Sequence, residues 1–165
     1  EKGIKKAMEL GDSVGGIVEC SVTGIPPGLG EPFFDSIESL ISHAVFSIPA
    51  IKGIEFGSGF AAARMTGSEH NDALLNAAGQ TSTNHAGGIS GGISNGNELL
   101  YRVAVKPTSS TPKAQQTVNM ETGNQETLAV KGRHDLCIAL RVPVVLEAVT
   151  KLVLADLFLE NHMYQ

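Results

Sequence analysis

Residues 87–110 read GGISGGISNGNELLYRVAVKPTSS, and this stretch joins a glycine-rich loop to an alternating strand and then to a lysine. Five glycines lie between residues 87 and 96, and isoleucine recurs among them at a four-residue spacing, at Ile89 and Ile93. Flexible linkers of this kind are usually polar throughout, so the pattern favours an ordered loop. Glycine is tolerated where φ is positive or where another group closely approaches the main chain. The loop is therefore expected to make room for a neighbouring element or a ligand.

The residues after this loop alternate as a half-buried strand does, with Leu99, Tyr101, Val103 and Val105 on one face. Pro107 cannot donate to a sheet, so the strand is expected to end beside Lys106. A lysine followed by hydroxyl side chains on freshly released backbone can hold an anion, because it combines a charge with several donors. These candidate binding residues are Lys106, Thr108, Ser109 and Ser110.

Length and composition indicate one ordered domain over residues 1–165, because 42% of the residues are hydrophobic. The formal net charge of -5, without any basic stripe, argues against nucleic acid as a partner. The longest apolar run is interrupted by Glu147, Lys151 and Asp156, which favours a buried helix over a membrane span. The chain also starts at Glu1 without a methionine, as expected of a piece of a longer protein or of a processed form.

Metal and hydrolase chemistry find little support in the sequence. Cys20 and Cys137 lie far apart without a ligand spacing, and we expect them to be reduced thiols in a reducing compartment. His70 and His85, with Glu69 and Asp72, fit no helix-borne metal motif, so polar loop roles are favoured for them. No G-x-S-x-G elbow is present, which argues against a Ser-His-Asp hydrolase.

Two helices stand out among the expected elements. The first is predicted over residues 31–45, with Pro32 in its first turn and Phe33 and Phe34 on its apolar face. The second begins near Pro143 and is apolar on nearly every side, so it must be covered on several faces. Together with the strand at residues 99–105, these helices predict an α+β fold in which helices are sandwiched with antiparallel sheets.

Several separated stretches point to one family: GDSVGGIVEC at residues 11–20, GSEHND at residues 67–72, NHAGGISGGISNG at residues 84–96, KPTSS at residues 106–110 and KGRHDLC at residues 131–137. A longer run, GLGEPFFDSIESLISHAVFSIPAIKGIEFGSGF, covers residues 28–60. In this order they resemble chorismate synthase over essentially the whole chain. A match of many parts is far more specific than a single glycine motif.

The resemblance implies a cytoplasmic, homotetrameric enzyme of the shikimate pathway, which leads to the aromatic amino acids. Such enzymes bind reduced FMN and convert 5-enolpyruvylshikimate 3-phosphate into chorismate. They eliminate phosphate and a ring hydrogen in a 1,4-anti sense, without net redox change. The fold of the family, helices sandwiched between antiparallel sheets, agrees with the one expected from the pattern.

Carried over by position, the resemblance implies one catalytic residue and a set of flavin contacts. Asp135 matches the acid that relays a proton at flavin N5. The flavin contacts are Pro49, Ala50, Gly91, Lys106, Thr108, Ser109, Ser110 and Arg133. From pattern alone, Arg133 and Asp135 would be an ordinary exposed ion pair and His134 a supporting residue. Pro49 stands where many members have Asn, and Leu136 replaces the usual proline after Asp135.

Motifs of the family's N-terminal half are missing from this sequence. It lacks the Gly-Glu-Ser-His motif, the Arg-Pro-Gly-His-Ala-Asp stretch and the Arg-Ser-Ser-Ala-Arg flavin segment. The resemblance therefore implies the C-terminal part of a chorismate synthase, inactive on its own. The alternative is a non-catalytic module that binds a phosphorylated ligand or assembles through its apolar helices.

Overall fold

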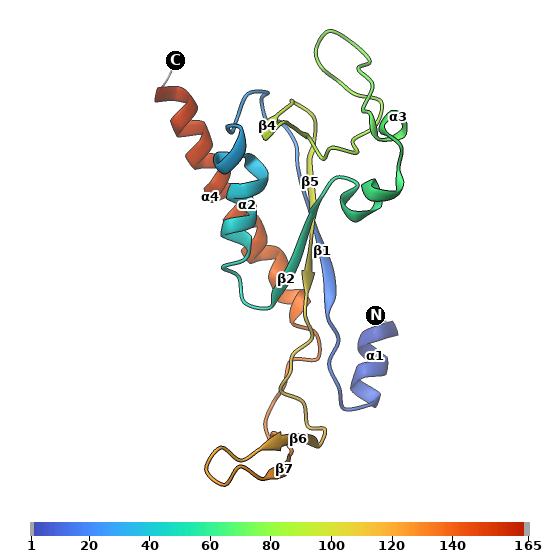
Figure 1. Cartoon of the computed structure of the whole chain (residues 1–165), viewed down its shortest axis with the longest axis vertical. Helices are drawn as coiled ribbons and strands as arrows, with labels where there is room; N and C mark the ends of the chain where they lie inside the picture. Colours follow the sequence, from blue (N-terminus) through green and yellow to red (C-terminus); the bar gives the residue numbers. More distant parts are fainter. Residues whose placement is uncertain (1, 164–165) are drawn as a thin grey trace.

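The computed structural model describes residues 2–163, and a three-stranded antiparallel sheet lies at its centre (Figure 1). Its strands are β1 (Gly16–Val22), β2 (Ile51–Phe56) and β5 (Leu99–Val105), in the order β1-β5-β2. β5 pairs with both neighbours and buries every second residue, from Leu99 to Val105. The alternating strand expected from the sequence is thus the middle of the sheet.

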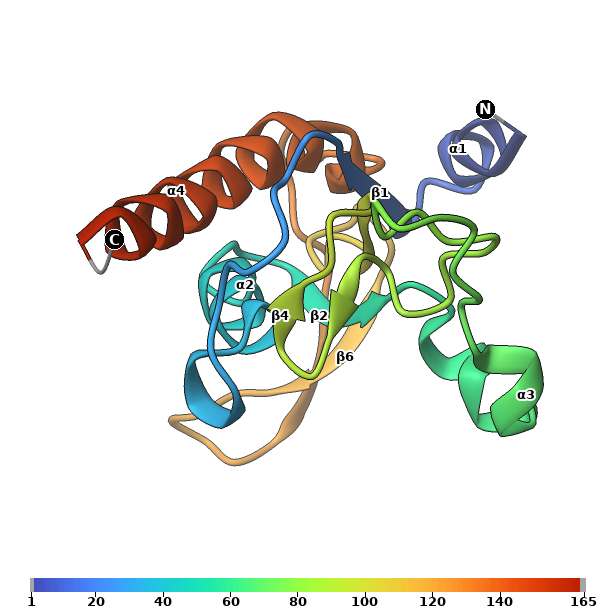
Figure 2. The same ribbon diagram turned by 90° about the horizontal axis from the view of Figure 1, so that it is seen from above.

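Two helices, α2 (Ile37–Val45) and α4 (Val142–Met163), cover one face of this sheet, with α4 beside β1 and α2 beside β2 (Figure 2). Residues of both helices and of β5 share one hydrophobic core, and Ile37, Ile41, Tyr101 and Leu146 are among its fully buried members. This arrangement confirms the predicted α+β class with antiparallel sheets.

The apolar helix α4 is covered on one side only within the described part of the chain. Val142, Leu146, Leu154 and Leu157 are buried, whereas exposed apolar residues form a ridge along the opposite side. The ridge consists of Val144, Leu152, Leu159 and Met163, each at least 65% exposed. The expected cover on several faces is not supplied by residues 2–163. Within these residues, no helix combines the length and hydropathy needed to cross a membrane.

The predicted start of the first helix is wrong. The chain forms a separate 3-10 turn, η1 (Phe33–Asp35), and α2 begins only after Ser36. Ser36 has an extended backbone, and its hydroxyl caps the helix by accepting a hydrogen bond from the Ser39 amide. Phe33 has a φ of 67° and, like Phe34, lies almost fully exposed. The capping serine therefore separates the two phenylalanines from the buried face of α2.

Short elements connect β2 to β5. The 3-10 turn η2 (Gly59–Arg64) follows β2, and α3 (Gly67–His70) replaces the polar loop expected there. α3 starts with a capping box, in which Thr66 and Glu69 satisfy each other's amides. The glycine-rich loop forms a hairpin of β3 (Ile89–Ser90) and β4 (Ile93–Ser94).

Two small elements project from the lower part of the molecule in Figure 1. The first helix, α1 (Lys2–Glu9), stops just before Gly11, which has a φ of 58°. The chain after Lys106 forms a hairpin of β6 (Gln115–Val118) and β7 (Gln125–Leu128). The chain returns from this hairpin through the 3-10 turn η3 (Ile138–Arg141) into α4.

Candidate functional site

Antiparallel pairing of β2 with β5 brings two predicted binding segments together. The Lys106 amide donates a hydrogen bond to the Ala50 carbonyl at 2.9 Å, directly beyond the pair formed by Ile51 and Val105. Ala50 has a φ of 73°, a conformation that non-glycine residues rarely adopt, in the tight turn after Pro49. Lys106, Pro49 and Ala50 therefore lie at the same end of the sheet.

The segment after Lys106 is fixed by the loop that precedes β1. The Ser13 hydroxyl donates a hydrogen bond to the Thr108 carbonyl. The hydroxyl of Thr108 itself is buried and has no hydrogen-bond partner among the described residues. Ser109 and Ser110 follow on exposed backbone. Since buried polar groups are nearly always bonded, the Thr108 hydroxyl is an open donor in this segment.

A second segment, residues 132–136, lies against the same loop. The Val14 amide donates to the Leu136 carbonyl at 2.9 Å, so the backbone next to Asp135 is anchored. A cavity of about 250 Å³ lies between the segments, and both Ser110 and Asp135 line it. The remaining lining residues are Met8, Gly11, Asp12, Ser13, Thr111, Pro112, Gly132, His134 and Leu136. The fold thus places predicted residues from two distant segments around one cavity.

The two carboxylates of this cavity are both paired with cations. Asp12 accepts a bond from Lys113 Nζ at 2.7 Å, and the Lys113 contact together with the Ser13 amide holds the Asp12 pKa below its usual value. Asp135 Oδ1 accepts a bond from Arg141 Nη2, also at 2.7 Å. Neutralised carboxylates do not repel an anion as free ones would. The cavity is therefore compatible with a phosphorylated ligand.

Of the nine predicted site residues, Ser110 and Asp135 line this cavity, and Gly91 and Arg133 depart most clearly from expectation. Gly91 lies in the turn between β3 and β4, at the opposite end of β5. β5 has seven residues and spans about 23 Å at the usual rise per residue. Arg133 is exposed and forms no ion pair within residues 2–163, so the Arg133–Asp135 pair that the pattern favours is not observed.

Sequence reasoning missed two residues that line the cavity, Asp12 and Ser13, and it also missed Arg141, which pairs with Asp135. Asp12 and Ser13 belong to the GDSVGG stretch, which was noticed only as part of a family pattern. Arg141 is six residues from Asp135, and only the 3-10 turn η3 brings the two side chains together. No sequence periodicity marks so short a turn. His134, expected as a supporting residue, lines the cavity and contacts the Val130 carbonyl through Nε2 at 3.1 Å.

A larger cavity, of about 490 Å³, lies near the C-terminal end of α4 and contains no predicted site residue. Four carboxylates line it, from Glu31, Asp35, Asp156 and Glu160, and none has a cation partner among the described residues. Such a surface repels phosphate. The smaller cavity is therefore the candidate site, although it is not the largest.

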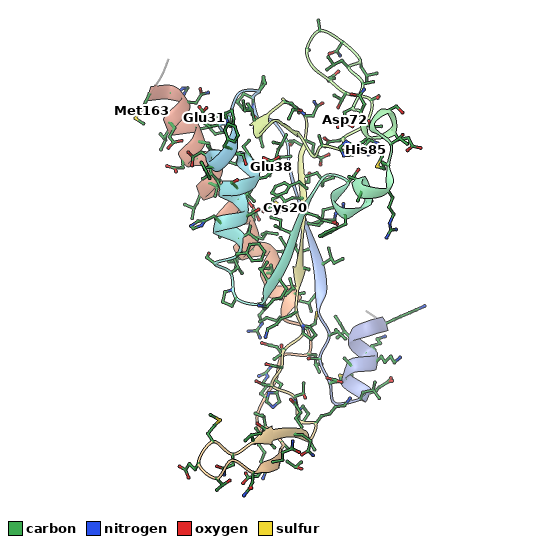
Figure 3. The ribbon with its side chains drawn as sticks, viewed as in Figure 1. Cys20, Glu31, Glu38, Asp72, His85 and Met163 are labelled. Carbon is green, nitrogen blue, oxygen red and sulfur yellow. The ribbon has the colours of Figure 1, made fainter. Side chains whose placement is uncertain are left out.

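His85 contacts other protein groups near Asp72 (Figure 3), and its Nδ1 lies 2.7 Å from the Ser58 hydroxyl oxygen. Asp72 accepts hydrogen bonds from the Thr83 hydroxyl and from the amides of His85 and Ala86. Burial raises the pKa of Asp72, but these bonds outweigh it and hold the pKa below its ordinary value. Because Asp72 accepts a bond from the main-chain amide of His85 and not from its ring, Asp72 and His85 are not arranged as in a Ser-His-Asp hydrolase triad. Residues 2–163 contain no cluster of three or more ligands that could hold a metal.

Comparisons with known proteins point to one family. Residues 1–159 match the chorismate synthase family. The chain is 71% identical over 159 residues to a chorismate synthase of Chitinophaga pinensis, covering 96% of this chain and 48% of that protein. For a chorismate synthase of Opitutus terrae the identity is 52% over 155 residues, covering 93% and 42%.

A solved structure described as a chorismate synthase crystal structure shares the fold, with a TM-score of 0.77 and 33% identity. The match covers 97% of this chain and 41% of the solved one. The chain spans about half the length of the curated relatives it matches. The family match nevertheless extends over nearly all of its residues, so this chain belongs to the chorismate synthase family.

Proposed function

We propose that this chain forms part of a chorismate synthase, a lyase that eliminates phosphate from 5-enolpyruvylshikimate 3-phosphate. The observation that carries the proposal is the shared cavity of Ser110 and Asp135, next to the segment that starts at Lys106. Ser110 in this cavity, with Lys106 on the same segment, can hold a phosphorylated ligand, and the Asp135 carboxylate lines the cavity and can exchange a proton.

The residues at this end of the sheet fit a part of reduced FMN. Lys106 supplies a charge, Thr108 a hydroxyl without a partner among residues 2–163, and Ser109 and Ser110 exposed hydroxyls and backbone, so these would hold the cofactor. Pro49 and Ala50 lie beside Lys106 and would contribute backbone contacts. When bound, reduced FMN supplies an electron-rich ring next to the substrate.

The assignments of Arg133 and Gly91 need different arguments. Arg133 lies on the segment that lines the cavity, and its free guanidinium would meet a phosphate there. Gly91 is separated from Lys106 by the length of β5, so one flavin is not expected to contact both within a single copy. A contact by Gly91 would require another copy of the chain, which favours the homotetramer implied by the resemblance.

In this proposal Asp135 acts as the proton-transfer group of the chain. Arg141 occupies one of its oxygens, and the other has no hydrogen-bond partner among residues 2–163. The free oxygen would accept a proton beside flavin N5 while the ring hydrogen of the substrate is lost. Lys106 and the hydroxyl residues would hold the ligand during this step.

The setting of the enzyme is also a proposal. We expect residues 1–165 to form a single domain, since one hydrophobic core serves the sheet and both large helices. We expect a cytoplasmic location, and no turnover by the chain alone, because it spans only about half of its relatives' length and lacks the family's two histidine motifs.

The test replaces Asp135 in a chimaeric enzyme, in which residues 1–159 substitute for the matching part of the Chitinophaga pinensis relative. Asp135→Asn keeps the size of the side chain and removes the base. We expect chorismate formation with reduced FMN, assayed anaerobically, to fall about 10²–10⁴-fold with little change in flavin or substrate affinity. The chain without the chimaeric partner is the negative control. Near-normal turnover of the variant would contradict the proton-transfer role.

A further inference from the structure

Arg141, and not the neighbouring Arg133, holds the carboxylate of Asp135. Its Nη2 donates to Asp135 Oδ1 at 2.7 Å, and it does so from the last residue of η3. We propose that Arg141 is a positioning residue: it fixes one oxygen of Asp135 and leaves the other available for proton transfer. This inference rests on the proposed function, because it assigns a helper to the group that the function requires.

The backbone near Asp135 is anchored, but its side chain is not fixed by the backbone alone. Val14 holds the Leu136 carbonyl at 2.9 Å, and the Cys137 thiol contacts the Gly15 carbonyl at 3.9 Å. Both contacts involve residues that follow Asp135 in the sequence, so neither of them restricts the rotamer of the Asp135 side chain. A charge-assisted bond from a planar guanidinium restricts that rotamer, because the donor geometry is rigid. The Asp135 side chain is 40% exposed, so it stays accessible to a ligand.

Among the described residues, the other charged groups around the cavity bond to groups other than Asp135 or form no ion pair. Asp12, from the loop before β1, pairs with Lys113 at 2.7 Å. His134 uses Nε2 for the Val130 carbonyl, and Arg133 forms no ion pair in the described part of the chain. Among residues 2–163, Arg141 is thus the one cation bonded to Asp135.

A carboxylate released from Arg141 would sample several rotamers, and few of them would suit proton transfer. Misplacement of a reacting group by about 1 Å can lower a rate about 10²-fold. Substrate and flavin binding would change little, since Arg141 does not line the cavity. Loss of this residue should therefore lower kcat and leave KM nearly unchanged.

The first experiment observes the ion pair directly in the 165-residue chain. The side-chain carboxyl ¹³C resonance of Asp135, assigned with Asp135→Asn, is compared in Arg141→Met, Arg141→Lys and Arg133→Met. We expect it to move in Arg141→Met, to return most of the way in Arg141→Lys, and to stay in place in Arg133→Met. Arg141 is 73% exposed, so its substitution should not unfold the chain, and circular dichroism checks this. An unmoved resonance in Arg141→Met overturns the inference.

The second experiment measures turnover of the chimaeric enzyme. Arg141→Met should lower kcat about tenfold to a hundredfold with KM unchanged, and Arg141→Lys should recover most of the loss. Arg64→Met, an exposed arginine at the end of η2, is the matched control and should retain full activity. A normal kcat together with a moved resonance would reduce Arg141 to a surface ion pair and overturn the inference. Normal turnover of Asp135→Asn would instead overturn the proposed function, while the resonance would still report the pair.

Discussion

Tyr101 joins the centre of the sheet to α4 through one buried hydroxyl contact. Its phenol oxygen lies 2.6 Å from the Thr150 hydroxyl oxygen, and the Thr150 hydroxyl lies 2.6 Å from the Leu146 carbonyl. Since the Thr150 proton is donated to that carbonyl, Tyr101 must be the donor to Thr150. Burial raises the pKa of Tyr101, so the phenol stays protonated and keeps this donor.

The direction of these bonds predicts an asymmetry between two substitutions. Thr150→Val leaves the Tyr101 hydroxyl buried without its partner, which should lower the free energy of unfolding by about 1–3 kcal/mol. Tyr101→Phe removes the donor and leaves Thr150 bonded to Leu146, so it should cost only about 0.5–1.5 kcal/mol. Urea unfolding of the two variants measures the difference.

The double variant serves as the control for this pair. When Tyr101 is already phenylalanine, Thr150→Val leaves no buried phenol hydroxyl without a partner. The double variant should therefore lower the free energy of unfolding by less than the sum of the two single changes. Strict additivity, or a larger cost for Tyr101→Phe than for Thr150→Val, would contradict the assigned direction of the bonds.

At the scale of elements, regular patterns were predictable and nonlocal contacts were not. The alternation of β5 predicts its bounds, and the apolar run of α4 predicts the start of that helix to within one residue but not its end. The predicted start of α2 is several residues too early. Pro32 and the two phenylalanines suggest a helix start before Ser36, whereas Ser36 has an extended backbone and caps the helix. At the site, the end of β5 located Lys106, but its contact with Ala50 follows from antiparallel pairing that no local pattern encodes.

The close approach of β2 to the glycine-rich loop depends on Gly57. This residue has a φ of 51°, and a Cβ placed there would lie 2.1 Å from the His85 carbonyl oxygen. The Ser58 amide bonds the same carbonyl at 2.8 Å, so the two backbones cannot separate without losing this contact. Gly57→Ala should therefore lower the free energy of unfolding by more than about 3 kcal/mol, from backbone strain and steric overlap together. Thermal unfolding monitored by circular dichroism measures it.

Gly91 offers a matched control for this substitution. Its φ is 62°, close to that of Gly57, but a Cβ there would meet no atom within 4 Å. Gly91→Ala should cost only the conformational strain of a left-handed residue, about 1–2 kcal/mol. Equal costs at the two positions would show that the approach of β2 to the loop does not limit stability.

On the scale of the whole molecule, the two sides of α4 differ in what the chain supplies. The sheet and α2 cover the side that carries Leu146, which is 1% exposed, whereas Leu152 on the outer ridge is 71% exposed. The two leucines thus lie on the same helix but in opposite environments. Composition alone could not separate them, because apolar residues lie on nearly every side of α4.

This difference predicts unequal effects of the same truncation in the isolated chain. Leu146→Ala removes packed methyl groups and leaves a cavity, so it should lower the free energy of unfolding by about 2–5 kcal/mol. Leu152→Ala removes no contact with the core and keeps a strong helix former, so the change should stay within about 0.5 kcal/mol. Urea unfolding at low protein concentration measures both variants. A cost of several kcal/mol for Leu152→Ala under these conditions would mean that the outer ridge is already covered in solution, contrary to the exposure seen in this fold.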